Sequence, residues 1–324
     1  MKHWIEAARV RTLPLSVSGI LVGSFYAMSQ AEFKNHWEIV ILALTTTLGL
    51  QILSNFANDY GDGVKGTDNE DRIGPKRAIQ SGLITPGEMR YAIFITAFLT
   101  LVSAMSLIYF SFRGKHLLYS LIFFVLGILA IASAIRYTIG KNPYGYRGFG
   151  DIFVFVFFGL VSTLGVSFMI LKKIDPILIL PATSIGLLSV SVLNLNNMRD
   201  ENSDRKSGKN TLVVQNGGSW AKKYHFFLIL TAIILFIIFA VIFDFYKDNN
   251  PENINIDDYF FFIFFTPLFF HLKRVYKNTE PRLLDPELKK VALTTFFLCF
   301  ILSIEMIALL DLRIIDFLKY KFNL

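Results

Sequence analysis

Cysteine and histidine are scarce in this 324-residue sequence, which has one cysteine, Cys299, and 5 histidines. A single cysteine cannot form an intrachain disulfide, and it has no partner for a cysteine-type metal site. The histidines show none of the spacings at which paired histidines ligate a metal. These shortages exclude a disulfide framework and a zinc module, and they leave oxygen-bearing side chains as the candidates for metal chemistry.

Charged residues are also few, at 18%, whereas hydrophobic residues reach 53% and the mean hydropathy is +0.50. A membrane span needs about 20 mostly apolar residues, and helices of soluble proteins have one polar face. Runs that meet the membrane criterion occur at 13–29, 39–57, 91–112, 117–135, 152–171, 177–195, 226–245 and 291–310, with a shorter ninth that begins at Tyr259 and contains Pro267. The sequence therefore predicts an all-α membrane bundle of about nine transmembrane helices, forming one domain over residues 1–324.

Basic residues are distributed unevenly between the two sides of such a bundle. With nine spans and the N-terminus inside, segments 1–12, 58–90, 136–151, 196–225 and 273–290 share one side and hold most of the 32 lysines and arginines. Cytoplasmic segments of membrane proteins carry this excess of positive charge. Topology thus explains most of the net charge of +7. The expected partner is a lipid bilayer, with no nucleic acid and no obligate protein partner evident.

Two acidic segments interrupt the apolar chain. The first, "NDYGDGVKGTDNEDR" at 58–72, follows the second predicted span. The second acidic segment, "NLNNMRDENSDRKSGKNT" at 194–211, follows the sixth predicted span, and its aspartate-rich motif lies within 196–211. Because even-numbered spans end on the same side, both segments face the cytoplasm in the predicted topology. This arrangement indicates an internal repeat of a helix followed by an acidic segment.

Polar residues four positions apart recur in both acidic segments. The pairs are Asn58 with Asp62, and Asp200 with Asp204. Residues four apart share one face of a helix, so each pair faces one direction if its helix continues beyond the membrane surface. In the first segment, an overlapping face through Asn55, Asp59 and Asp62 is equally compatible with the sequence.

This spacing predicts a divalent cation, because like charges at i, i+4 repel unless a cation lies between them. Oxygen ligands without histidine or cysteine favour Mg²⁺, which is held by one or two carboxylates plus phosphate oxygens of a substrate. Basic residues follow both acidic faces: Lys65, Arg72, Lys76 and Arg77 after the first, and Arg199, Arg205, Lys206 and Lys209 around the second. Together these groups predict a diphosphate site. The alternative is a solvated cytoplasmic loop with charges of both signs.

A diphosphate whose remaining part lies in a membrane is a polyprenyl diphosphate. Its tail fits among apolar helices while its head reaches the acidic faces. Loss of diphosphate from an allylic carbon leaves a delocalised cation that must be shielded from water. Aromatic faces stabilise such a cation, and the chain has 33 phenylalanines, although most phenylalanines of a membrane protein pack or face lipid.

Both motifs resemble those of the UbiA superfamily of intramembrane prenyltransferases. "NDYGD" and the D-x-x-x-D of Asp200 and Asp204 fit its two Asp-rich motifs. The next aspartate of the first motif, Asp68, comes two positions late, and Gly66 stands in its place. Longer stretches resemble the branch that prenylates 1,4-dihydroxy-2-naphthoate in menaquinone synthesis: "ARVRTLPLSVSGILVG", "NDYGDGVKGTDNEDRIGPKRAIQSG" and "NPYGYRGFGDIFVFVFFG". The resemblance covers essentially the whole chain.

This resemblance implies Mg²⁺ as cofactor, a polyprenyl diphosphate donor and decarboxylative prenylation of the naphthoate ring. It also implies a bacterial-type cytoplasmic membrane, with the active site facing the cytoplasm. Its motifs assign catalytic and metal-binding roles to four residues: Asn58, Asp62, Asp200 and Asp204. Further metal contacts are expected from Asp59 and Asp68.

The basic and aromatic residues nearby become candidates for binding the two substrates. Diphosphate-binding candidates are Lys65, Arg72 and Lys209, with a local ion pair between Arg72 and Asp68 as the alternative for Arg72. Arg147 and Tyr137, in the loop 136–151, are the candidates for the acceptor. An anchor loop with interfacial tyrosines is the alternative interpretation of that loop.

Two other functions are compatible with parts of this pattern. The same fold with another acceptor, such as 4-hydroxybenzoate or homogentisate, would keep both acidic motifs. A polytopic transporter would place charged groups near the middle of the bilayer, commonly on broken helices. Here charge is concentrated at predicted helix ends on one side, which favours a prenyltransferase over a transporter.

Overall fold

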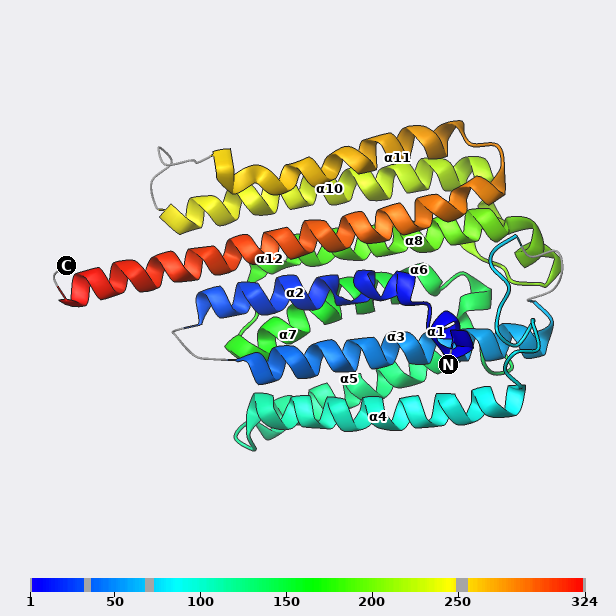
Figure 1. Cartoon of the computed structure of the whole chain (residues 1–324), viewed down its shortest axis with the longest axis horizontal. Coiled ribbons are helices and arrows are strands. Elements are labelled where there is room, and N and C mark those ends of the chain that lie inside the picture. The colour runs from blue at the N-terminus through cyan, green and yellow to red at the C-terminus, as the bar shows by residue number, and fades with distance from the viewer. Residues whose placement is uncertain (1, 32–35, 68–72, 249–255, 323–324) are drawn as a thin grey trace.

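The computed structural model describes residues 2–31, 36–67, 73–248 and 256–322, and the regular elements within these ranges are all helices. The α-helices are α1 (Lys2–Ala8), α2 (Leu13–Gln30), α3 (Trp37–Lys65), α4 (Pro86–Phe112), α5 (Leu117–Arg136), α6 (Gly150–Val154), α7 (Ser162–Leu171), α8 (Ile179–Lys206), α9 (Leu212–Asn216), α10 (Gly218–Asp248), α11 (Thr266–Lys277) and α12 (Leu284–Phe322). Shorter helical turns are η1 (Val10–Thr12), η2 (Tyr144–Arg147), η4 (Pro176–Leu178), η6 (Ile256–Phe265) and η7 (Pro281–Leu283), and the π-helical η3 (Phe155–Val161) joins α6 to α7. Figure 1 shows the long helices lying side by side along one axis.

Among the described residues, six helices are long and apolar enough to cross a membrane. They are α3, α4, α5, the continuous α6–η3–α7, the continuous η4–α8, and α10. A seventh span is formed if α1 and α2, which are bent by 54° relative to each other, count as one. Helices also occupy the two remaining predicted positions, in η6–α11 and in α12. The all-helical membrane bundle is therefore confirmed, and the total of nine spans stays a prediction.

Local sequence signals determine where the first acidic helix ends and where the next helix begins. Helix α3 ends at Gly66, whose φ of +72° lies in the left-handed region that favours glycine. Helix α4 begins with a capping box in which the Thr85 side chain accepts from the Glu88 N–H and Glu88 accepts from the Thr85 N–H. Pro86 occupies the first turn, where its missing N–H has no cost. The connection between α3 and α4 therefore begins at a glycine that ends one helix and finishes at a capping box that starts the next.

The G-x-x-x-G motif of α2 allows close approach to α7. A methyl group at Gly19 would lie 2.0 Å from Ser162 Oγ, and one at Gly23 would lie 2.2 Å from the Thr163 carbonyl oxygen. Both distances are shorter than any non-bonded contact between a carbon and an oxygen atom. The two glycines therefore serve packing within the bundle, as small residues do in membrane helix interfaces.

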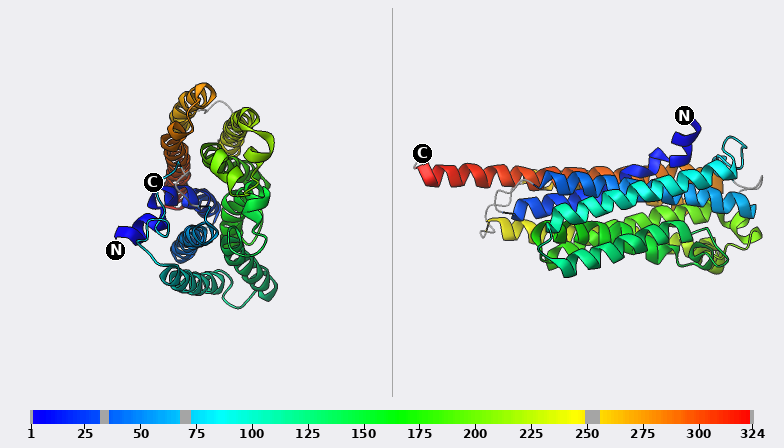
Figure 2. Two further views of the ribbon diagram at one scale, coloured as in Figure 1. Left: turned by 90° about the vertical axis from the view of Figure 1, so that its right-hand side faces the viewer. Right: turned by 90° about the horizontal axis from the view of Figure 1, so that it is seen from below.

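Buried apolar residues form separate clusters on either side of α2. One cluster joins α2 to α8, α10, α11 and α12, and another joins α2 to α3, α4 and α7. A third cluster packs α1 and the segment after α3 against α3 and α4. Figure 2 shows the end-on view, in which α10 and α11 lie at one end of the cross-section and α4 and α5 at the other. This arrangement places α3 and α8, the helices that carry the acidic motifs, between the two ends.

Candidate active site

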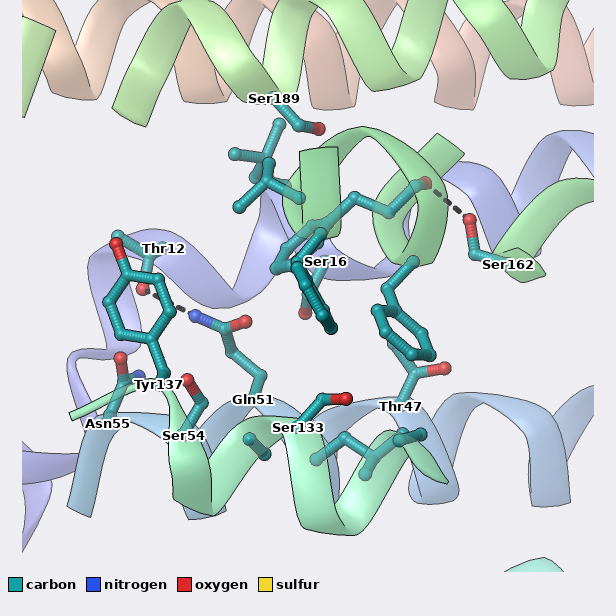
Figure 3. A pocket seen from close by; sticks show the side chains of 18 of the residues that line it. Thr12, Ser16, Thr47, Gln51, Ser54, Asn55, Ser133, Tyr137, Ser162 and Ser189 are labelled. Atoms are coloured by element: carbon teal, nitrogen blue, oxygen red, sulfur yellow. Dashed lines mark hydrogen bonds between the residues drawn. The ribbon is translucent and has the colours of Figure 1, made fainter. Parts of the chain in front are cut away.

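One cavity of about 380 Å³ runs through the bundle between α2, α3, α5, α7 and α8. Helix α3 lines it with residues spaced three and four apart: Ala43, Thr46, Thr47, Leu50, Gln51, Ser54, Asn55, Asn58 and Asp62. At a rise of about 1.5 Å per residue, the stripe from Ala43 to Asp62 is roughly 28 Å long. Figure 3 shows part of this cavity, with Gln51, Ser54 and Asn55 of α3 across from Thr12 and Ser16 of the α2 region.

The two ends of the cavity differ in polarity. Its apolar end is lined by Ile20, Ala43, Leu107, Ile108, Phe123, Val166 and Met169. Small residues from α4, α5 and α7, namely Ala104, Gly127, Ala130 and Gly165, widen the space between these larger side chains. The other end holds carboxylate, amide, guanidinium and ammonium groups. The cavity therefore suits a ligand with a polar head and a hydrocarbon tail.

At the polar end, the structure resolves the register of the first acidic motif. Asn55, Asn58 and Asp62 line the cavity. Asp59, one residue from Asn58 and therefore about 100° away around the helix, is 1% exposed and is not among the lining residues. Successive residues of a helix cannot share one direction, so only part of the predicted acidic set faces the cavity.

Asp62 is oriented by an aromatic side chain from the loop 136–151. The Tyr146 hydroxyl donates to Asp62 Oδ1 at 2.7 Å, and Thr67 Oγ1 lies 2.6 Å from the same hydroxyl. The Nζ atoms of Lys65 and Lys209 lie 4.5 and 5.9 Å from the centroid of the Tyr146 ring. Sequence reasoning did not assign Tyr146 a role. The only available signal was its place in a tyrosine-rich loop on the predicted cytoplasmic side.

Asp59 lies between two arginines. Its Oδ1 accepts from Arg9 Nη2 at 2.8 Å and lies 3.6 Å from Arg77 Nε, while its Oδ2 accepts from the Ala78 N–H at 3.4 Å. Both arginines line the cavity. In this structure the carboxylate of Asp59 contacts these two guanidinium groups. A contact between Asp59 and a metal stays a prediction.

The second acidic motif, on α8, presents Asn196, Asp200 and Asp204 to the cavity. Arg199 is 1% exposed and donates to both oxygens of Asp200, from Nε at 2.9 Å and from Nη2 at 2.6 Å. The same guanidinium donates to Asn196 Oδ1 at 2.8 Å and to Asp285 Oδ1 at 2.5 Å. Arg199 therefore fixes Asp200 against the first turn of α12.

Asp204 is paired with a lysine from the segment after α8. Lys209 Nζ lies 3.5 Å from Asp204 Oδ1. Burial alone would lower the pKa of Lys209, but the carboxylates of Asp204 and Asp62 raise it above its usual value. The other carboxylate oxygen, Asp204 Oδ2, is buried and has no hydrogen-bond partner within the described part of the chain. An unpartnered buried carboxylate oxygen is open to a cation.

Tyr137 completes the polar end of the cavity. Burial, opposed by Lys209 and assisted by nearby carboxylates, raises the pKa of Tyr137 to about 12. Its hydroxyl therefore stays protonated at any physiological pH and remains a hydrogen-bond donor. Figure 3 shows Tyr137, Thr12 and Asn55 among the side chains that line this cavity.

Two further predicted residues, Lys65 and Arg147, do not line the cavity. Lys65 is exposed and donates to the Thr138 carbonyl oxygen at 2.7 Å. Arg147 is also exposed, with its guanidinium 6.0 Å from the centroid of the Phe149 ring. Asp68 and Arg72 lie outside the described residues. The structure thus brings together Asn58, Asp62, Asp200, Asp204, Lys209 and Tyr137 at one cavity.

Comparison with known proteins matches residues 16–247 to the UbiA prenyltransferase family. The chain belongs to this family. It is 47% identical over 237 residues to the 1,4-dihydroxy-2-naphthoate octaprenyltransferase of Escherichia coli (strain K12), covering 73% of this chain and 75% of that one. The protein of the same name from Haemophilus influenzae (strain ATCC 51907 / DSM 11121 / KW20 / Rd) is 38% identical over 307 residues, covering 95% and 96%. The predicted resemblance is thereby confirmed, and the chain is a multi-pass membrane protein.

Solved UbiA structures share the fold. A UbiA homologue from Archaeoglobus fulgidus bound to DMAPP and Mg²⁺ has a TM-score of 0.61 at 15% identity, over 95% of this chain and 99% of that one. The apo structure of a UbiA homologue from Aeropyrum pernix K1 has a TM-score of 0.63 at 13% identity, over 94% and 99%. At these identities the likeness concerns the arrangement of helices.

The donor set of this UbiA-family cavity fits a Mg²⁺ ion that shares its coordination with a substrate. Among the described residues, no three His, Cys, Asp or Glu side chains converge closely enough to hold a metal by themselves. Mg²⁺ rarely uses such an all-protein cage and is usually held by one or two carboxylates plus water and phosphate oxygens. Asp62 and the open Oδ2 of Asp204 supply that kind of partial site.

Proposed function

We propose that the chain transfers a polyprenyl group from polyprenyl diphosphate to 1,4-dihydroxy-2-naphthoate, with loss of CO₂ and diphosphate, to give demethylmenaquinol. The observation that carries this proposal is the single cavity that joins Asp62 and Asp204, from distant parts of the chain, to a long apolar end. The names of the Escherichia coli and Haemophilus influenzae relatives support the naphthoate acceptor and an octaprenyl donor.

Mg²⁺ is the proposed cofactor, held by Asn58, Asp62, Asp200 and Asp204 together with the diphosphate. The bound ion neutralises the charge that develops on the leaving diphosphate. Lys209 binds the same diphosphate, since its ammonium group lies beside Asp204 at the polar end. Lys65 and Arg72 stay predictions for this role, as do Asp59 and Asp68 for the metal.

The apolar part of the cavity protects the reaction from water. Aromatic side chains line the region next to the polar end: Tyr137, Tyr144, Phe153, Phe157 and Phe158. Their ring faces stabilise the allylic cation that forms as diphosphate leaves. The electron-rich ring carbon that bears the carboxylate then attacks the cation, and loss of CO₂ restores aromaticity. Positioning of the acceptor is therefore more important than a general base.

The polar end of the cavity is proposed to face the cytoplasm of a bacterial-type inner membrane. The excess of lysine and arginine on the side that carries both acidic motifs supports this orientation. A cysteine introduced at the exposed Asn210, in a Cys299→Ser background, should react with an impermeant maleimide in inverted membrane vesicles. Reaction from the outside of intact cells would reverse the orientation.

The acceptor is tested with purified protein, Mg²⁺, octaprenyl diphosphate and dihydroxynaphthoate labelled in the carboxyl group. The expected result is release of labelled CO₂ together with a prenylated quinol. Omission of Mg²⁺ should abolish both products. Product formation with 4-hydroxybenzoate or homogentisate, but not with dihydroxynaphthoate, would contradict the proposed acceptor and retain the reaction class.

A further inference from the structure

Positively charged side chains line the cavity at four positions in the part of the chain that the structure describes: Arg9, Arg77, Lys209 and Lys289. The first three each lie within ion-pair distance of an aspartate. The side chain of Lys289, on α12, has no hydrogen-bond or ion-pair partner among the described residues. A lysine that lines a cavity and has no partner in the protein is available to an anionic ligand.

Lys289 lies on the side of α12 that adjoins the second acidic motif. Asp285 precedes Lys289 by one turn on the same side of the helix. Asp285 accepts from Arg199, and Arg199 also donates to Asp200. This contact holds the beginning of α12 against the end of α8. Lys289 therefore lines the cavity within one helical turn of its polar end, and it comes from a helix that neither acidic motif includes.

The other side of α12 is held by a buried histidine–glutamate network, formed by His225 of α10, His271 of α11 and Glu287 of α12. The Nε2 atoms of the two histidines lie 2.7 Å apart, a distance at which one ring donates to the other. His271 Nδ1 donates to Glu287 Oε2 at 2.6 Å. Glu287 also accepts from Arg274 Nη1 at 3.3 Å and from Lys290. Buried networks whose members are hydrogen-bonded specify one arrangement of the helices that they join.

The histidine–glutamate network fixes the rotation of α12 about its own axis. Successive residues of an α-helix differ in direction by about 100°, so residues two apart point to nearly opposite sides. Glu287 and Lys289 are two apart. Because contacts with α10 and α11 hold Glu287 on one side of α12, Lys289 is directed to the side that lines the cavity. The network itself does not line the cavity.

We propose that α12 supplies a third side of the diphosphate site: Lys289 binds the diphosphate, and the histidine–glutamate network positions this lysine. A diphosphate carries more negative charge than one Mg²⁺ ion neutralises, and lysine is a common partner for the remainder. Lys209 is already paired with Asp204, whereas Lys289 has no carboxylate partner among the described residues. The assignment rests on the proposed function only in taking a prenyl diphosphate as the donor.

Titration of the purified protein with inorganic pyrophosphate in the presence of Mg²⁺ tests the assignment without turnover. Lys289→Gln should weaken pyrophosphate binding about tenfold, because one charge-assisted contact is lost. Lys289→Arg keeps the charge and should bind within about threefold of the unaltered protein. Lys273→Gln, at an exposed position of α11 outside the cavity, is the matched control and should bind as the unaltered protein does. Unchanged binding in Lys289→Gln would overturn the proposal.

Steady-state kinetics show which substrate Lys289 binds. In Lys289→Gln the KM for octaprenyl diphosphate should rise about tenfold, while the KM for the acceptor stays within about twofold. A rise in the acceptor KM alone would place Lys289 beside the acceptor and overturn the assignment. If the protein uses none of the tested aromatic acceptors, the proposed function fails, and the pyrophosphate titration still tests Lys289.

A double-mutant cycle tests the positioning role of the histidine–glutamate network. Glu287→Gln keeps the size of the side chain but removes the charge that His271 and Lys290 contact. Alone, it should weaken pyrophosphate binding about three- to fivefold. In the Lys289→Gln background it should have almost no further effect, because the side chain that it positions is already absent. Equal losses in both backgrounds would indicate a general effect on the fold and overturn the positioning role.

Discussion

The ends of α3 and α8 carry similar sequences but different electrostatic environments. Both have an Asn or Asp four residues before a cavity-lining aspartate, yet their carboxylates have different partners. Asp62 of α3 accepts one hydrogen bond from the neutral phenol of Tyr146. Asp200 of α8 accepts from both Nε and Nη2 of the buried Arg199. A repeated motif in the sequence therefore need not give two equivalent halves of a site.

This difference assigns separate tasks to the two helix ends. Asp62 accepts from one phenol and Asp204 has one open oxygen, and these are the carboxylates best placed to approach a cation. Arg199 holds Asp200 in place and also donates to Asp285, which lies 86 residues after Arg199 in the chain. We infer that Asp200 acts with a fixed geometry, while Asp62 and Asp204 adjust as the metal and diphosphate bind.

The largest effect is expected for Asp62→Asn and Asp204→Asn. Each should lower kcat about 10³-fold or more, because charge stabilisation by a bound metal contributes several kcal/mol to the transition state. Turnover is measured in detergent with octaprenyl diphosphate and dihydroxynaphthoate, with monodispersity confirming that the protein is folded. Glu201→Gln, whose partner Arg205 is exposed, is the control on the same helix. Full activity in either aspartate variant would contradict the proposed metal site.

A smaller effect is expected for Arg199→Lys. Lysine keeps the charge but loses the guanidinium fork that holds both oxygens of Asp200. Groups that orient a metal ligand typically change metal affinity about 10- to 100-fold, so the half-saturating Mg²⁺ concentration should rise by that factor. Asp285→Asn should shift it in the same direction by less. An unchanged Mg²⁺ dependence in Arg199→Lys would show that Asp200 needs no fixed geometry.

The smallest effect is expected for Tyr146→Phe. This substitution removes the hydroxyl that orients Asp62 at the end of α3, as Arg199 orients Asp200 at the end of α8. The variant keeps the ring beside Lys65 and Lys209 and loses one hydrogen bond to Asp62. A single hydrogen bond to a charged group contributes about 1.5–3 kcal/mol, of which an adaptable site recovers part, so we expect Mg²⁺ affinity to fall about tenfold or less. A loss larger than that of Arg199→Lys would reverse the proposed division between the two ends.

Several features of the site could be predicted from the sequence because they depend on local order along a helix. The spacing of Asn58 with Asp62 and of Asp200 with Asp204 predicts shared faces, and both pairs line one cavity. The apolar runs likewise predict the helices that enclose it. Lys209 was also predicted to lie near the acidic groups, because it follows α8 by only three residues.

Other features depended on contacts between distant segments. The sequence allowed two registers for the first motif, and the environment of Asp59 decides between them: Arg9, 50 residues away, and Arg77 draw its carboxylate out of the cavity wall. Tyr146 and Asp285 could not be assigned, since their partners are fixed by how the loops fold back over the helix ends. Arg147 was a reasonable candidate by charge, yet its side chain points to the surface.

The sequence by itself determined that the chain is a bundle of apolar helices with acidic ends on one side, because hydrophobicity and helical spacing are properties of neighbouring residues. It also determined membership of the UbiA family, through motifs that extend over short stretches. Only the tertiary structure decided which carboxylates of "NDYGDGVKGTDNEDR" face the cavity. Each side chain of a helix has its own direction, and the charges that meet it come from segments far away in the chain.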